Sequence, residues 1–275
     1  MEFLVYILIL VATGTLVGFA SGLLGVGGGF IMVPVQFFLL TTMGVDPTTA
    51  IRIAFGTSLA VILPTAVSGA MGHMRRGAVM VRPAVLMGVS GIIGAFIGGT
   101  TASNVPGDFL KFLFGFLVLA AALRMAFAGD YENGGEPKTR ALPYIFWGFT
   151  TGFIAGLLGI GGGIIMVPVL SIIMGFNMRR VVGTTSAIMV FTATGGIVAY
   201  IIGGIHATGL PPYSLGYINL IQFALLAGLS IPMAQLGVKA SHRIPEKELR
   251  YIYVILMFYI ALKMIGVFEW LHLPF

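Results

Sequence analysis

Residues 18–34 read GFASGLLGVGGGFIMVP, and residues 152–168 repeat them as GFIAGLLGIGGGIIMVP. The two copies agree at 13 of 17 positions at a constant offset of 134. This pattern cannot form an ordinary helix interior, because each glycine there costs roughly 1 kcal/mol and a proline about 3 kcal/mol. In a membrane, broken backbone is tolerated only where protein buries it or where it lines a cavity. Two such breaks in matching halves of a chain indicate the binding site of a membrane carrier.

The composition is that of a membrane protein. Of the 275 residues, 58% are hydrophobic and 9% are charged, and the mean hydropathy is +1.03. A soluble domain carries about 25% charged residues, so a soluble enzyme is excluded. The absence of cysteine excludes disulfides and thiolate metal sites. The apolar run that starts at Phe3 lacks a basic leader, so we expect a retained first span and no cleaved signal peptide.

The apolar segments form two sets of five, and all ten are predicted to be helices because lipid requires backbone groups to be paired within the segment. They are 3–25, 28–43, 50–72, 84–102 and 109–128, then 142–159, 162–176, 182–204, 217–236 and 249–267. The polar stretch 129–141 divides them. We therefore expect a first transmembrane repeat over 1–128, a cytoplasmic linker over 129–141 and a second transmembrane repeat over 142–275.

The charges of the loops predict inverted repeats. If all five segments of each half cross, the second half is inverted relative to the first and both termini lie outside. Twelve of the fifteen Lys and Arg residues then lie on the cytoplasmic side, as the positive-inside rule requires. This bias also accounts for the net charge of +6 without any nucleic-acid partner. The segments 28–43 and 162–176 are short for a full crossing, so partial insertion remains an alternative.

The doubled block Gly-x-x-x-Gly-x-x-Gly-x-Gly-Gly-Gly-x-x-x-x-Pro resembles the TauE/SafE family of sulfite exporters. The stretches Thr57-Ser58, Gly183-Thr-Thr-Ser186 and Gly209 to Asn219 fit the same family. The resemblance covers nearly the whole chain. It implies transport of small sulfur-containing anions, such as sulfite, sulfoacetate or related organosulfonates, across the cell membrane.

The two glycine clusters are the first candidates for substrate binding. A glycine break can aim free backbone N–H groups and helix N-termini at an anion, and it lets a ligand approach the backbone. The alternative is close packing of helices through small residues. The candidate residues are Gly25, Gly27, Gly28 and Gly29 in the first half and Gly159, Gly161, Gly162 and Gly163 in the second.

Hydroxyl and cationic side chains recur in the segments that follow the breaks. At an offset of 128, Arg52, Thr57 and Ser58 align with Arg180, Thr185 and Ser186. The hydroxyls can donate to an anion while staying neutral, or they can bond to carbonyls of their own helix. Arg52 and Arg180 are candidate entrance charges at the two membrane faces, or they anchor lipid headgroups.

Asn219 and Gln222 lie three residues apart in the segment 217–236 and are expected to share one helix face. Amides inside a span are costly, so they either bind substrate or bond to another helix. The acidic residues and histidines fall in loops or near segment ends, and none forms a catalytic or metal-binding pattern. We expect no metal and no cofactor.

The sequence thus predicts a multi-pass secondary transporter of the cell membrane, and no enzyme. Its substrate is expected to be a small sulfur-containing anion, held at the paired breaks and exported by alternating access. An anion channel of the same architecture, an uptake permease for another small anion, and a structural subunit of an assembly remain alternatives. The small-residue faces are compatible with a homodimer in the lipid bilayer.

Overall fold

A computed structural model of the chain describes residues 3–127, 140–241 and 246–267. The first half contains five helices, which are α1 (Phe3–Leu24), α2 (Gly29–Thr42), α3 (Pro47–Met74), α4 (Val81–Asn104) and α5 (Gly107–Phe127). Asp46 caps α3 by accepting a hydrogen bond from the Thr49 N–H at 3.0 Å. Pro47 follows at the first helical position, where its missing N–H costs nothing.

The second half repeats this order. It contains α6 (Leu142–Leu158), α7 (Gly163–Pro168) with a π-helical turn η1 (Val169–Ile173), α8 (Met178–Gly204), α9 (Leu220–Ala240) and α10 (Glu246–Ile265). A two-stranded antiparallel hairpin, β1 (Ser214–Leu215) and β2 (Ile218–Asn219), precedes α9. The predicted all-α polytopic architecture is confirmed, but the helix expected from residue 217 is wrong, because the chain turns at Gly216 and α9 begins at Leu220.

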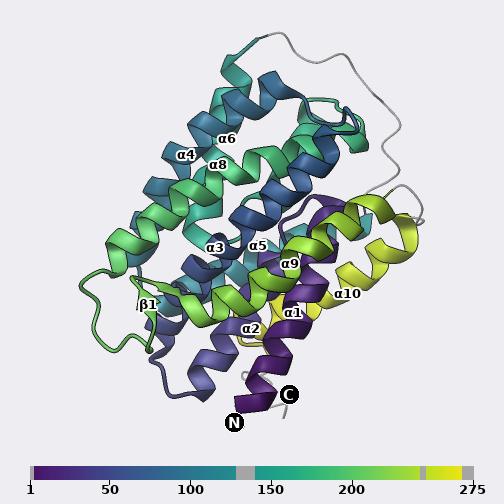
Figure 1. Cartoon of the computed structure of the whole chain (residues 1–275). Helices are drawn as coiled ribbons and strands as arrows, with labels where there is room; N and C mark the ends of the chain where they lie inside the picture. The colour runs from purple at the N-terminus through teal and green to yellow at the C-terminus, as the bar shows by residue number, and fades with distance from the viewer. Residues whose placement is uncertain (1–2, 128–139, 242–245, 268–275) are drawn as a thin grey trace.

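Helices α3 and α8 pack together in the middle of the molecule (Figure 1). On one side α4 packs on both α6 and α8, and on the other side α9 packs on both α1 and α3. Each glycine-broken helix, α1 or α6, therefore packs against the fourth helix of the opposite half. The two halves interlock and do not form separate bodies.

The central helices run in opposite directions. A Cβ built on Gly56 would lie 3.0 Å from the Tyr200 Cβ, and one built on Gly69 would lie 3.8 Å from the Ser186 Oγ. As the residue number rises along α3, the partner's number falls along α8. The third helices of the two halves, α3 and α8, are therefore antiparallel to each other.

The packing of α1 on α9 is repeated by the packing of α6 on α4. Glycines at every fourth position of α1 touch backbone of α9, and glycines 134 residues later touch backbone of α4. The pairs are Gly14–Leu226, Gly18–Ser230 and Gly22–Ala234, and then Gly148–Met87, Gly152–Gly91 and Gly156–Ala95. The residue number of each α9 partner is 139 higher than that of the equivalent α4 partner, as for Met87 and Leu226. Small residues let these backbones approach closely, as in other membrane helix pairs.

Among the residues that the structure describes, six helices are long and apolar enough to cross a membrane, namely α1, α3, α4, α5, α8 and α9. Helix α2 has 14 residues and would span about 21 Å, less than the ~30 Å of a hydrocarbon core. The stretch Gly163–Ile173 is shorter still. The linker predicted at 129–141 falls almost wholly outside the described residues.

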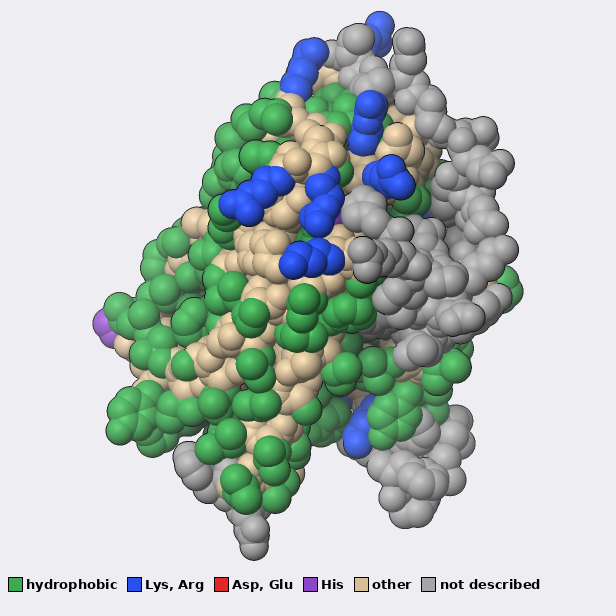
Figure 2. All heavy atoms as spheres, turned by 45° about the vertical axis from the view of Figure 1, so that its right-hand side comes forward, with side chains coloured by type: hydrophobic (Ala, Val, Ile, Leu, Met, Phe, Trp, Pro, Cys, Tyr) green, Lys and Arg blue, Asp and Glu red, His purple; other side chains and the backbone are tan. Residues whose placement is uncertain are grey.

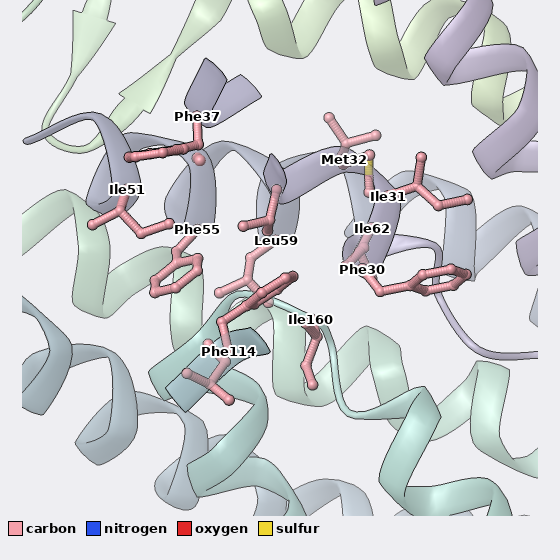
Figure 3. Packing of buried hydrophobic residues seen from close by; sticks show 14 of the residues in the cluster. Phe30, Ile31, Met32, Phe37, Ile51, Phe55, Leu59, Ile62, Phe114 and Ile160 are labelled. Atoms are coloured by element: carbon pink, nitrogen blue, oxygen red, sulfur yellow. The ribbon is translucent and has the colours of Figure 1, made fainter. Parts of the chain in front are cut away.

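The core joins side chains of both halves. Figure 3 shows Phe30 of α2, Phe55 and Leu59 of α3, Phe114 of α5 and Ile160 of the second glycine loop packed together. Figure 2 shows that Lys and Arg side chains gather toward the upper end of that face, whereas its lower part is mostly hydrophobic. The glycine loops thus lie inside an apolar molecule with a basic end.

Candidate functional site

The two glycine loops have the same backbone conformation. Gly25, Gly27 and Gly28 join α1 to α2 with φ values of 68°, 80° and 65°. At the offset of 134, Gly159, Gly161 and Gly162 join α6 to α7 with φ values of 66°, 69° and 89°. Side chains of L residues rarely adopt this left-handed conformation, so these six positions require glycine for the turn itself.

The fourth glycine of each loop serves a different purpose. Gly29 and Gly163 begin the helices that follow, and their backbones touch the opposite loop. A Cβ on Gly29 would lie 2.7 Å from the Ile160 Cα, and a Cβ on Gly163 would lie 2.5 Å from the Val26 carbonyl carbon. Val26 and Ile160 are themselves 134 residues apart. The contacts are therefore reciprocal, as in a two-fold interface.

The central helices hold the crossing loops from both sides, and these contacts also come in equivalent pairs. They are Gly25 with Val182 and Gly159 with Phe55, and then Gly27 with the Met189 Sδ and Gly161 with Ile62. The equivalent partners on the two central helices differ by 127 in residue number, both for Phe55 and Val182 and for Ile62 and Met189. A single symmetry relation thus describes the loops and both central helices.

Two threonines, one on each central helix, form a hydrogen bond with the start of the fourth helix of the opposite half. The Thr57 Oγ1 accepts a hydrogen bond from the Asn219 N–H, at 2.9 Å, at the start of α9. The Thr184 Oγ1 accepts one from the Met80 N–H, at 3.0 Å, at the start of α4. Thr57 and Thr184 differ by 127, and Met80 and Asn219 differ by 139.

This register corrects the alignment of the hydroxyl pairs by one residue. The structure matches Thr57 with Thr184 and Ser58 with Thr185, at an offset of 127 and not 128. Thr184 is not among the site residues predicted from the sequence, although the run Gly183-Thr-Thr-Ser186 contains three hydroxyl residues in a row. Only the contact with Met80 shows which of them corresponds to Thr57.

The hydroxyls of Ser58 and Thr185 form no hydrogen bond within the described part of the chain. Both side chains are fully buried, and neither oxygen has a hydrogen-bond partner among the described residues. Buried polar groups in native proteins are almost always paired, so two equivalent exceptions need a reason. The Ser58 Oγ lies 3.2 Å from the position of a Cβ on Gly29. Ser186, the third candidate, instead donates to the Val182 carbonyl at 2.9 Å.

The helices that leave the two breaks start without side-chain caps. The N-cap residues are Gly28 for α2 and Gly162 for α7, and neither makes a side-chain capping bond. An uncapped helix N-terminus presents N–H groups and the positive end of the helix dipole. The described part of the site thus offers neutral donors, which are backbone N–H groups and two hydroxyls.

The structure places the two amide residues, which the sequence predicted to share one helix face, in different positions of α9: Asn219 is the N-cap and Gln222 lies in the first turn. Asn219 caps α9, and its Oδ1 accepts a hydrogen bond from the Gln222 N–H at 3.0 Å. Asn219 thus lies at the start of α9 and not within the helix, and its part in substrate binding stays a prediction. Gln222 is fully buried, and its side-chain amide has no hydrogen-bond partner among the described residues. Gln36 of α2 is equally buried, and its amide has no partner among the described residues.

The two candidate entrance charges differ in their surroundings. Arg52 is half-buried and binds the Val105 carbonyl and the Tyr217 hydroxyl. Arg180 is exposed, and its backbone N–H donates to the capping side chain of Asn177. At the offset of 127 the counterpart of Arg52 is Arg179, which is also exposed. The equivalent arginines at the two ends of the molecule therefore differ in how far they are buried.

Comparisons with known proteins agree with this architecture. Residues 10–264 match the model of the sulfite exporter TauE/SafE family. A probable membrane transporter protein of Methanocaldococcus jannaschii is 28% identical, with 90% of this chain and 91% of the relative covered. Probable membrane transporter proteins of Haemophilus influenzae and Bacillus subtilis are each 26% identical and cover 94% and 95% of this chain and 98% of each relative. No solved structure matches the chain.

With a family match over most of its length and six apolar helices long enough to span a bilayer, the chain is a multi-pass membrane transporter of the cell membrane and belongs to the TauE/SafE sulfite exporter family.

Proposed function

We propose that the chain exports small sulfur-containing anions, such as sulfite, sulfoacetate or related organosulfonates, and binds them beside the crossing glycine loops. The description of the family as sulfite exporters supports a sulfur oxyanion as the substrate and export as the direction. The observation that carries the location is the pair of buried, unpartnered hydroxyls of Ser58 and Thr185. Each hydroxyl can donate one hydrogen bond to an oxyanion, which would satisfy a group that is otherwise costly to bury.

The anion binds next to the crossing and not within it. Gly29 and Ile160 already pack backbone against backbone, so no room is left between the loops. Ser58 lies one helical turn after Phe55, which touches Gly159, and Thr185 lies three residues after Val182, which touches Gly25. The two hydroxyls therefore stand at equivalent places on the two central helices, where the uncapped helix starts can also contribute N–H groups.

Alternating access would follow from the symmetry of the two halves. The antiparallel packing of α3 on α8 and the reciprocal loop contacts support inverted repeats. In transporters built from such repeats, one half rocks against the other around a site between them. The donors beside the loops are neutral, so a monovalent substrate would carry its own charge across the membrane. The inside-negative potential then favours export by about 2.3 kcal/mol per 100 mV.

A binding experiment tests the site. The purified protein is unfolded thermally with increasing sulfite, sulfoacetate or chloride at constant ionic strength. A ligand at 100 times its Kd stabilises the folded state by about 2.7 kcal/mol. We expect stabilisation by a sulfur anion and none by chloride, with the effect reduced in Ser58→Ala and Thr185→Ala. Equal stabilisation of the wild type and both variants would place the site elsewhere.

A further inference from the structure

Arg52 lies in the second turn of α3 and its guanidinium is incompletely paired. One terminal nitrogen donates to the Val105 carbonyl at 3.0 Å, and the other donates to the Tyr217 hydroxyl at 3.3 Å. The guanidinium also lies 5.8 Å from the centroid of the Tyr217 ring. The Nε atom is buried and has no hydrogen-bond partner among the described residues.

Arg52 makes no ion pair within the part of the chain that the structure describes. Its contacts in the described part of the chain are a carbonyl, a hydroxyl and an aromatic ring, all of them neutral. Asp46, the residue that precedes α3, is engaged in capping through Thr49. A partly desolvated cation without an ion pair is a place where an anion is favoured.

Two other cations, Lys111 of α5 and Lys263 of α10, pack over α2, the helix that precedes α3. The Lys111 Nζ lies 5.6 Å from the Phe37 ring centroid, and the Lys263 Nζ lies 4.6 Å from that of Phe38. Arg52 alone among the three belongs to a central helix. This difference makes Lys111 a matched control for the loss of a positive charge.

Arg52 is connected to the second glycine loop. One turn along α3, Phe55 packs directly against Gly159. The Tyr217 N–H donates to the Tyr200 carbonyl at 3.1 Å, and the Tyr200 hydroxyl donates to the Leu157 carbonyl at 3.3 Å, two residues before Gly159. The cation thus stands at the end of a packed path that leads to the proposed binding site.

We propose that Arg52 forms a separate anion-binding position at the mouth of the transport route on the side where α3 begins, with Nε–H as the free donor. The inference rests on the proposed function and adds a residue that acts before or after the loop site. The route is asymmetric, because the counterpart Arg179 is exposed at the other end. Arg52 therefore favours entry or release of the anion at one face only.

The experiment compares transport kinetics in proteoliposomes for the wild type, Arg52→Gln, Arg52→Lys and Lys111→Gln, with a sulfur anion as substrate. Loss of a charged hydrogen bond is expected to raise KM about tenfold in Arg52→Gln, with kcat changed less than about twofold if the loop site binds as before. Arg52→Lys should lie between the wild type and Arg52→Gln, because lysine keeps the charge without the planar fork. Lys111→Gln should keep the wild-type KM.

A second variant covers the case in which Arg52→Gln fails to fold. The chain has no cysteine, so Arg52→Cys carries the only thiol and can be modified after reconstitution. With sulfoacetate as the substrate, which unlike sulfite does not cleave the mixed disulfide, a methanethiosulfonate reagent that attaches ethylammonium should lower the raised KM toward the wild-type value. The analogous reagent that attaches ethylsulfonate should raise it further.

The outcomes separate this inference from the proposed function. If Arg52→Gln transports with the wild-type KM, or if Lys111→Gln raises KM as much as Arg52→Gln does, the role of Arg52 is overturned and the proposed function stands. The absence of saturable transport of any sulfur anion by the wild type would overturn both proposals.

Discussion

Replacing Gly29 with alanine would put a methyl group between the two glycine loops. The new Cβ would lie 2.7 Å from the Ile160 Cα, 3.0 Å from the Gly159 oxygen and 3.2 Å from the Ser58 Oγ. The φ of Gly29 is not in the left-handed region, so the substitution strains no dihedral angle. Its effect therefore reports on the crossing itself. Two of the three nearest atoms belong to backbone and cannot rotate away.

Overpacking of a tight core costs about 1–3 kcal/mol, and the rigid backbone contacts place Gly29→Ala in the upper part of that range. A loss of about 2 kcal/mol changes the ratio of folded to unfolded protein by roughly 30-fold. The assay is reversible denaturant unfolding in mixed micelles, followed by transport in proteoliposomes. Gly163→Ala, the equivalent change, should lose a similar amount, because its Cβ meets the Val26 backbone.

The control is Gly228→Ala in α9, where a Cβ meets nothing within 4 Å. That variant should be as stable as the wild type, or more stable by up to about 1 kcal/mol, because alanine favours a helix. If Gly29→Ala and Gly163→Ala unfold and transport like Gly228→Ala, the two loops do not cross as described and the reasoning is refuted.

Other substitutions give further expectations. Thr57→Val and Thr184→Val should each cost about 1–3 kcal/mol in unfolding free energy, because the N–H at the start of α9 or α4 loses its acceptor. The corresponding serine variants should retain most of the stability, and unchanged valine variants would argue against these bonds. Ser58→Ala should leave the stability of the ligand-free protein unchanged or raise it, since its buried hydroxyl has no partner in the described chain, but should weaken anion affinity about two- to tenfold in a thermal-shift titration. A clear loss of stability with unchanged affinity would make Ser58 a structural residue.

Local patterns in the sequence predicted most of the architecture. The glycine runs and the prolines are readable because they break helices wherever they occur, and their constant offset of 134 reveals the repeat. The structure shows that the eight glycines divide into two kinds. Six adopt left-handed turns, whereas Gly29 and Gly163 allow the opposite loop to approach. The sequence cannot separate these kinds, because the second depends on contacts between residues far apart in the chain.

The candidate site was predicted less completely for the same reason. Which hydroxyl of the run 184–186 is paired and which is free depends on where α4 and α8 lie relative to each other, so Thr184 was missed and Ser186 was overrated. Asn219 looked like an amide within a span because Tyr217 and Ile218 extend the apolar run. The turn at Gly216 ends that run in a hairpin and makes Asn219 a helix cap.

The most direct test of the central claim is the potential-driven accumulation of a monovalent organosulfonate in proteoliposomes. The wild type is compared with the double variant Ser58→Ala/Thr185→Ala under an interior-positive potential of about 100 mV, which is worth about 2.3 kcal/mol per charge. An uncoupled carrier should concentrate the anion about 50-fold inside, with a saturable rate that the double variant largely loses. Equal internal levels with and without the potential would contradict uncoupled anion transport, and undiminished saturable uptake by the double variant would contradict a site beside the crossing glycine loops.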